Sequence, residues 1–164
     1  GIVGMGKAAE IALSRFAGDS VRIAHLRDLL EELLLKSCPG SRVNGSGQNR
    51  LPNTSNISFR YIEGESILVL LDQQGICAST GSACTAGSSE PSHVLRAMKV
   101  PPDWLQGAVR FSLGRFNTDE EVHYVNQIVP SIVQRLQGLS SLGKLGQQRA
   151  EPARRGTGTA GFRG

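Results

Sequence analysis

Apolar residues recur at helical spacing over the first quarter of the chain. Between Gly6 and Lys36 they form stripes three or four residues apart, made by Ala8, Ile11, Ala12, Phe16, Ile23, Leu26, Leu29, Leu30, Leu33 and Leu34. Gly18 loosens a helix and Asp19 can cap a new one, so the pattern predicts either one long helix or two. Pro39 ends this region, because the residue before a proline is driven out of helical geometry.

The middle of the chain changes to shorter patterns. Residues 54–61 alternate between apolar and polar and predict a strand. Residues 67–71 are continuously apolar, and we favour a helix there over a buried strand, because two glutamates precede them and a glycine-ended polar run follows. Residues 76–78 predict a short strand. The segment 79–89 then contains mainly small residues, which bury little, so it is expected to be a mobile surface loop.

The last patterned region predicts two helices with a strand between them. A short helix is expected from Pro91 to Met98, and residues 108–113 alternate as a strand. Residues 118–121 have the composition of a capping box and open a final helix, whose apolar face is made by Val122, Val125, Val129, Ile132, Val133 and Leu136. Helices and strands thus alternate, which predicts a small α+β fold with helices packed on one sheet.

Length and composition are those of one folded domain. The chain has 164 residues, of which 39% are hydrophobic and 20% charged, and this excludes full disorder. No apolar run reaches the roughly 18 residues that cross a bilayer, and the first residues lack a signal-peptide pattern. The sequence therefore predicts a cytoplasmic protein that does not bind membranes.

The net charge of +4 comes from the end of the chain. Residues 138–164 carry five basic residues and one acidic residue, and the remainder has thirteen of each. Without a basic patch in the folded part, and with few aromatic residues to stack on bases, nucleic acid is not an expected partner. Residues 141–164 are rich in Gly, Arg and Gln and are expected to be disordered.

Three cysteines without a secretion signal argue for reduced thiols. Cys38 and Cys77 are expected to be small core residues, the usual role of a free cysteine. Cys84 has only small neighbours, so it is a candidate exposed nucleophile. A zinc site at Cys77, Cys84 and His93 is disfavoured, because the spacing is unusual and a fourth ligand is missing.

Arg110 alternates with Val109 and Phe111 along its strand. It is either an arginine on a solvent-facing sheet or a planar, permanently charged fork that grips a carboxylate or phosphate. The spacing leaves both interpretations open. The glycines match neither a Walker loop nor a dinucleotide-binding fingerprint.

One long motif resembles a known family. Residues 79–97 read Ser-Thr-Gly-Ser-Ala-Cys-Thr-Ala-Gly-Ser-Ser-Glu-Pro-Ser-His-Val-Leu-Arg-Ala, which closely resembles the active-site loop of NifS/IscS-like cysteine desulfurases, a group of class-V aminotransferases. Residues 51–59, 63–65 and 109–116 agree as well, in family order. With the opening residues, the resemblance extends over about residues 1–140.

The resemblance implies the small C-terminal domain of a fold-type I transferase that depends on pyridoxal phosphate. Residues 1–36 would be a connecting helix region and residues 37–140 the small domain, with the active-site loop at 79–89. Such enzymes convert L-cysteine into L-alanine and an enzyme-bound persulfide. By resemblance, Cys84 is the nucleophile that carries this persulfide, whose sulfur can contact an iron–sulfur cluster, and Arg110 holds the substrate carboxylate.

The resemblance also implies partners and a cellular role. A complete enzyme is expected to be a homodimer that passes sulfur to an iron–sulfur scaffold or another acceptor protein, for cluster assembly or nitrogenase maturation. Two alternatives stay open. A selenocysteine lyase would share the cofactor and the carboxylate clamp, and a non-catalytic module would keep the fold and only bind a partner or a metal.

The family's cofactor lysine occurs in a Ser-x-His-Lys motif, which this sequence lacks. Lys7, Lys36, Lys99 and Lys144 stand in other contexts. Because the chain also starts at Gly1 without a methionine, we expect a C-terminal fragment that lacks the large cofactor-binding domain and is inactive alone. The segment 143–164 shows no resemblance to the family.

Overall fold

A three-stranded antiparallel sheet forms the centre of the molecule in the computed structural model, which describes residues 1–81 and 92–140. The strands are β1 (Ser41–Val43), β2 (Thr54–Phe59) and β3 (Ala108–Ser112), with β2 in the middle. In the register, Val43 pairs with Ile57 and Ser55 pairs with Phe111. The α+β class expected from the sequence is confirmed.

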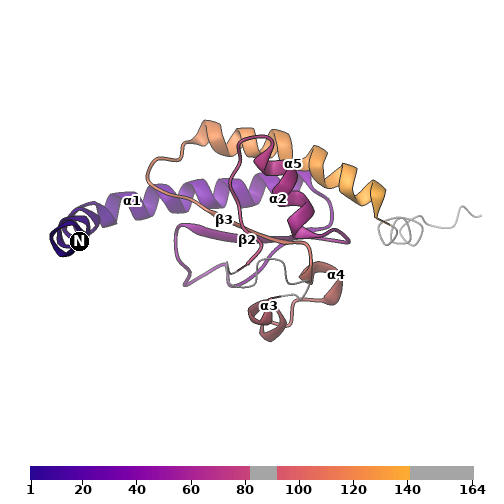
Figure 1. Ribbon diagram of the computed structural model, residues 1–164, viewed down its shortest axis with the longest axis horizontal. Helices are drawn as coiled ribbons and strands as arrows, with labels where there is room; N and C mark the ends of the chain where they lie inside the picture. The colour runs from indigo at the N-terminus through magenta and orange to yellow at the C-terminus, as the bar shows by residue number, and fades with distance from the viewer. Residues whose placement is uncertain (82–91, 141–164) are drawn as a thin grey trace, which may run out of the picture.

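Helices lie on both sides of this sheet (Figure 1). On one side are α1 (Ile2–Ser37), α2 (Gly64–Asp72) and α5 (Asp119–Leu139). On the other side are the short helices α3 (His93–Ala97) and α4 (Pro102–Leu105). The main core fills the space between the sheet and the three longer helices. Its fully buried side chains include Leu26, Leu30, Leu34, Ile57, Phe59, Ile67, Leu71, Val109 and Val129.

The first helix is continuous through Gly18 and 36 residues long, so the one-helix alternative is the correct one. Its two halves differ. All of its buried residues lie from Ile23 onwards, whereas the part before Ile23 leaves apolar side chains exposed at Ile2, Val3, Met5, Leu13, Phe16 and Val21. Only the second half therefore packs on the sheet.

Polar contacts tie the connection between β1 and β2 to the first helix. Arg50 forms an ion pair with Glu31 at 2.7 Å, and Ser55 donates a hydrogen bond to the same carboxylate at 2.7 Å. Arg27 donates to the carbonyl of Leu51 at 2.8 Å. Because these groups are mostly buried, they fix where β2 enters the sheet.

The final helix opens as the sequence indicates. Thr118 accepts a hydrogen bond from the backbone of Glu121, and the Glu121 side chain accepts one from the backbone of Thr118, which completes the capping box. This reciprocal cap fixes the start of the helix that covers the core.

The structure corrects several expectations. Residues 76–78 form no strand, because the chain leaves α2 through Gly75 at φ +71° and pairs only at Ser79, in an isolated bridge to Arg110. Strand β1 and helix α4 were not predicted from the sequence. Strand β2 ends at Phe59 rather than Tyr61, whose φ is +64°. Cys38 is buried as expected, but Cys77 is exposed, so its assignment to the core is wrong.

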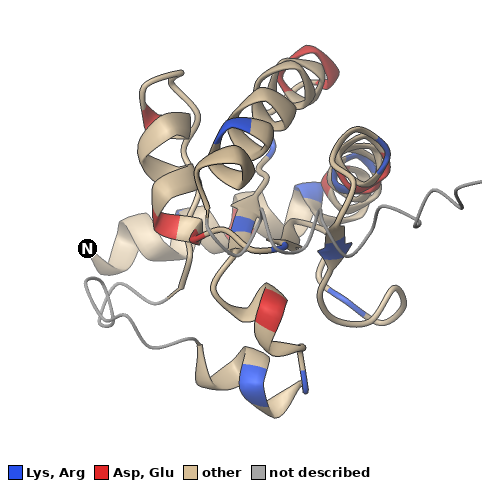
Figure 2. Cartoon of the chain, turned by 90° about the vertical axis from the view of Figure 1, so that its right-hand side faces the viewer, with Lys and Arg blue, Asp and Glu red and all other residues tan. Residues whose placement is uncertain are grey.

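Within the described ranges, none of the helices combines the length and the apolar character that a membrane crossing requires. Basic and acidic residues are interspersed over these helices (Figure 2).

Candidate active site on the open face of the sheet

The two faces of the sheet carry different side chains because successive residues of a strand point to opposite sides. On β3, Val109 and Phe111 are buried in the main core, whereas Arg110 and Ser112 are exposed. We call the side away from the core the open face. In register it carries Arg42, Asn44, Thr54, Asn56, Ser58, Arg110 and Ser112.

A small apolar cluster covers one end of this side of the sheet. Ala108 is buried there against Leu95 and Val100, with Trp104 and Leu105 packed around them. The short helices α3 and α4 therefore cover Ala108 and stop before Arg110. The open face begins where this cluster ends.

The backbone of Arg110 lies between two neighbouring segments of the chain and is hydrogen-bonded to one of them. Asn56 is its Cα partner on β2, and on the other side Ser79 and Arg110 exchange two backbone hydrogen bonds, with the Ser79 N–H donating at 3.0 Å. The residue therefore sits in the middle of a three-chain pairing. Its guanidinium has a fixed base.

The guanidinium itself makes no hydrogen bond or ion pair with any residue in the described ranges. Other arginines nearby are engaged: Arg22 binds two backbone carbonyls, Arg50 binds Glu31 and Arg60 binds Asp103. No residue in the described part of the chain occupies the N–H donors of Arg110, which lie on an exposed sheet surface, as a carboxylate or phosphate site requires.

Cys84 lies outside the described residues. It follows Ser79 by only five residues in the sequence, and this spacing limits how far apart the two residues can be. Five extended residues span at most about 18 Å. Covalent connectivity therefore limits the distance between the Cα atoms of Ser79 and Cys84 to this value, and Ser79 is bonded to Arg110.

The packing around Gly64 explains why residue 64, in the segment 63–65, is a glycine. A Cβ at this position would lie 2.7 Å from the Thr80 side chain and 2.8 Å from the Ala108 carbonyl. The missing side chain therefore lets the start of α2 approach both the site-bearing strand and the residue after Ser79.

Three polar side chains beside Arg110 were missed by the sequence reasoning. Asn44 is only 5% exposed, and its Nδ2 donates at 2.7 Å to both Asn56 Oδ1 and Ser58 Oγ. The alternation of β2 could have placed Asn56 and Ser58 on this face, but no local signal marks Asn44 as their neighbour across the sheet.

The structure describes three of the four lysines. Lys7 forms an ion pair with Glu10 at 2.9 Å on the exposed half of α1, and Lys36 and Lys99 are also exposed. Lys7 and Lys36 belong to α1 on the covered side of the sheet, and Lys99 follows α3 on the other side. Lys144 lies outside the described residues.

No group of three or more His, Cys, Asp or Glu side chains is arranged to hold a metal ion in residues 1–81 and 92–140. His93 is the exposed first residue of α3. The proposed iron–sulfur contact through Cys84 falls outside the described part of the chain.

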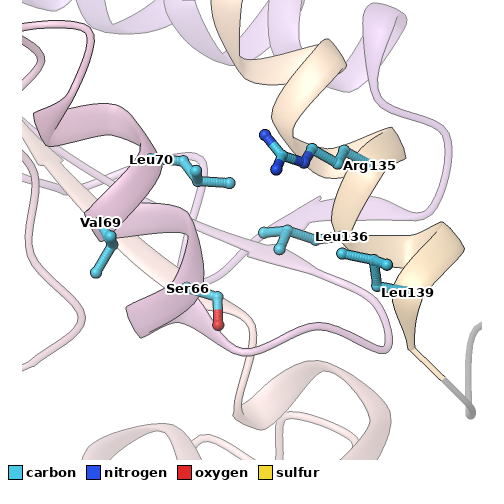
Figure 3. A pocket seen from close by; sticks show the side chains of 6 residues that line it. All are labelled: Ser66, Val69, Leu70, Arg135, Leu136 and Leu139. Atoms are coloured by element: carbon cyan, nitrogen blue, oxygen red, sulfur yellow. The ribbon is translucent and has the colours of Figure 1, made fainter.

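A groove between α2 and α5 is separate from this site (Figure 3). Leu70 and Leu136 point toward each other across it, and Arg135 lies at its edge. It contains no residue of the open face.

Comparison with known proteins places these features in a family. The model of the family described as "Aminotransferase class-V" matches residues 1–125. The chain is 54% identical to a cysteine desulfurase of Trichormus azollae over 140 residues, which are 85% of this chain and 35% of that protein. It is 52% identical to the cysteine desulfurase NifS of Azotobacter vinelandii over 139 residues, again 85% and 35% of the two proteins.

The fold agrees as well. A solved structure of a NifS-like protein superposes with a TM-score of 0.71 at 34% identity, covering 83% of this chain and 34% of that one. The small α+β domain is therefore of the kind found in fold-type I enzymes of this group, as the resemblance implied. The chain spans about a third of the length of the curated relatives it matches.

Proposed function

The chain belongs to the class-V aminotransferase family, and from this premise we propose that it supplies two groups of a cysteine desulfurase. Arg110 holds the carboxylate of L-cysteine, and Cys84 accepts its sulfur. The observation that carries the proposal is the guanidinium of Arg110, which has no hydrogen-bond or ion-pair partner among residues 1–81 and 92–140, on a residue whose backbone is bonded to Ser79 in the segment that leads to Cys84. The relatives named as cysteine desulfurases, about half identical in sequence, support it.

Arg110 orients the substrate in this proposal. A guanidinium binds a carboxylate through two parallel hydrogen bonds, which fixes both the position and the rotation of the amino acid. Because the backbone of Arg110 lies beside β2 and exchanges two hydrogen bonds with Ser79, the bound substrate has a defined direction relative to Ser79. Such positioning is a precondition for attack at one chosen atom.

Cys84 performs the sulfur transfer in this proposal. Its thiolate attacks the sulfur of L-cysteine, so that a sulfur–sulfur bond forms while the carbon–sulfur bond breaks, leaving a persulfide and, after protonation of carbon, L-alanine. Pyridoxal phosphate, which supplies the electron sink for this cleavage in the family, is assigned to no residue of this chain, since the Ser-x-His-Lys motif that holds it in the family is absent from the sequence.

The wider role follows from the same premise. We propose that the cofactor-binding part of the enzyme is supplied outside this sequence, that the chain alone is inactive, and that the assembled cytoplasmic enzyme is a homodimer. The persulfide sulfur would pass to an iron–sulfur scaffold or another acceptor protein, in general cluster assembly or in nitrogenase maturation.

The test uses a chimera of this chain and the cysteine desulfurase of Trichormus azollae. In the chimera, this chain replaces the last third of that protein and follows its first two thirds. The chimera is expected to release L-alanine from L-cysteine, and this chain alone is not. Cys84→Ala should abolish alanine release while the cofactor's absorbance is retained. Arg110→Ala should raise KM for L-cysteine on the order of tenfold or more, because one charge-assisted contact is lost.

Ser112→Ala is the matched control, because Ser112 is also exposed on the open face of β3. An active chimera whose KM is unchanged by Arg110→Ala would overturn the role of Arg110. Loss of cofactor absorbance in Cys84→Ala would contradict the role of Cys84. L-Selenocysteine as sole substrate of the chimera would favour the selenocysteine lyase reading.

A further inference from the structure

The polar residues next to Arg110 form a row that crosses all three strands. Asn44 follows β1 and donates its backbone N–H to the carbonyl of Asn56 at 2.8 Å. Asn56 is in turn the register partner of Arg110, and Arg110 is bonded to Ser79. From one edge to the other, the row is Asn44, Asn56, Arg110 and Ser79.

Within this row, Asn56 and Arg110 are close neighbours. Backbone hydrogen bonds join Phe59 to Gly107 and Leu113 to Asn53. Because hydrogen-bonded and non-hydrogen-bonded pairs alternate along an antiparallel ladder, Asn56 and Arg110 are a non-hydrogen-bonded pair, the kind whose side chains lie closer together. Their Cβ atoms are expected to be about 5 Å apart.

The amide of Asn56 has a fixed direction. Its Oδ1 accepts a hydrogen bond from Asn44 Nδ2 at 2.7 Å. A carboxamide carries its oxygen and nitrogen on opposite sides, so Nδ2 of Asn56 faces away from Asn44, toward the side of the row where Arg110 lies. No acceptor for this nitrogen is found among residues 1–81 and 92–140.

The amide nitrogen of Asn44 donates to two neighbouring side chains, whereas its amide oxygen has no hydrogen-bond donor in the described part of the chain. Its Nδ2 also donates to Ser58 at 2.7 Å, while its own Oδ1 is buried without a partner in the described part of the chain. A buried acceptor without a donor is unfavourable and unusual in native proteins. Both of its amide hydrogens are used to orient the side chains beside it.

We infer that Asn56, aligned by Asn44, is a second ligand for the substrate carboxylate beside Arg110. This rests on the proposed function and adds a residue to its site. The guanidinium and the Asn56 amide together present only N–H donors, as an anion with two oxygens requires. Arg110 binds one or both oxygens, and Asn56 Nδ2 binds the oxygen nearer β2. Asn44 is a positioning residue, because it acts only through Asn56.

The test measures carboxylate binding by this chain in solution. The ¹⁵N-labelled chain is titrated with L-alanine, an unreactive amino acid with the same backbone carboxylate as L-cysteine, while the side-chain signals of Arg110 Nε and Asn56 Nδ2 are followed. Both signals are expected to move together and to saturate at the same concentration. L-Alaninamide, which lacks the carboxylate, should move neither.

Asn56→Ala should weaken L-alanine binding about tenfold, the effect of losing one hydrogen bond to a charged group. Asn56→Asp should weaken it further, because the new carboxylate competes for Arg110. Ser112→Ala should leave the affinity unchanged. Asn44→Ala should give a smaller loss and should collapse the two Asn56 amide proton signals toward each other, a change that a merely structural role of Asn44 would not couple to affinity.

The outcomes separate this inference from the function it rests on. If Arg110 responds to L-alanine while Asn56 does not, or if Asn56→Ala binds as tightly as the unchanged chain, the inference is overturned and the role of Arg110 stands. If Arg110 itself does not respond, both are overturned on this face.

Discussion

The two faces of the sheet are built from the same strands, and the same alternation of residues gives them opposite properties. Toward α1, α2 and α5, Ile57, Phe59 and Val109 are fully buried in the main apolar core. On the open face, one residue along in each strand, Asn56 and Arg110 are polar and at least partly accessible.

The difference shows that alternate residues of one strand can serve two purposes, stability on the covered face and ligand binding on the open face. Burial on the covered face stabilises the fold roughly in proportion to apolar area, so many residues of similar size would serve. On the open face the important quantities are the direction of a donor and the absence of a competing acceptor. Stability should therefore respond to changes on the first face and ligand binding to changes on the second.

The largest expected effect separates the faces directly. Phe59→Ala should lower the free energy of unfolding by about 3–5 kcal/mol, because Phe59 is fully buried in the main core. Arg110→Ala should change it by less than about 0.5 kcal/mol, because the side chain is exposed. Urea denaturation of both variants measures the difference. A loss above about 1 kcal/mol in Arg110→Ala would show that the guanidinium supports the fold and would erase the contrast.

A second change acts on the backbone where β2 meets β3. A Cβ on Gly107 would collide with the carbonyl oxygen of Phe59, whose N–H donates to the carbonyl of Gly107 at 2.9 Å. Gly107→Ala should therefore cost about 1–3 kcal/mol in the free energy of unfolding. Gly138→Ala in α5 is the control. Nothing lies within 4 Å of its added Cβ, and it should gain about 0.5–1 kcal/mol.

Urea denaturation measures the free energy of unfolding of both glycine variants. If Gly107→Ala and Gly138→Ala changed this free energy equally, the sheet would be able to shift to accept the methyl group, and this contact would not fix the register of the open face.

The sequence predicted the covered face better than the open one, for a physical reason. Long periodic stretches such as the α1 and α5 regions contain enough apolar positions to identify a helix and its buried side. A strand of three residues, such as β1, is too short for alternation to show. Residues 76–78 were misassigned for the same reason, since one buried and one exposed residue after α2 imitate a strand.

The site was predicted only in part. The alternation around Arg110 and the family resemblance pointed to one side chain, and the structure places it on the exposed side. Asn44 and Asn56 were missed because their roles depend on which residues meet across strands, which local sequence does not encode. Cys84, identified from its small neighbours, stays a prediction because it lies outside the described residues.

A smaller effect is expected at the start of α5, the helix that covers the core. Thr118→Ala removes the side-chain oxygen that accepts the Glu121 backbone N–H, and should lower the free energy of unfolding by about 1 kcal/mol. Thr118→Ser keeps that oxygen and should lose little. L-Alanine binding should be the same in both variants, since the cap lies on the covered side. A change in binding would show that the two faces are coupled.

The smallest expected effect tests whether the thiol of Cys38, on the covered side, is shielded from water as a core residue is. Burial raises the pKa of the Cys38 thiol, although a hydrogen bond from Ser37 opposes this. The folded chain therefore holds the thiol proton more tightly than the unfolded chain does. The resulting stability is complete below the ordinary thiol pKa and is lost as the pH rises through the raised value.

Urea midpoints measured at increasing alkaline pH should thus fall for the unchanged chain. Cys38→Ala should remove that part of the decline, whereas Cys77→Ala should retain it, because Cys77 is exposed. An identical decline in Cys38→Ala would mean that water reaches the thiol, and that the covered face is less closed than its apolar packing indicates.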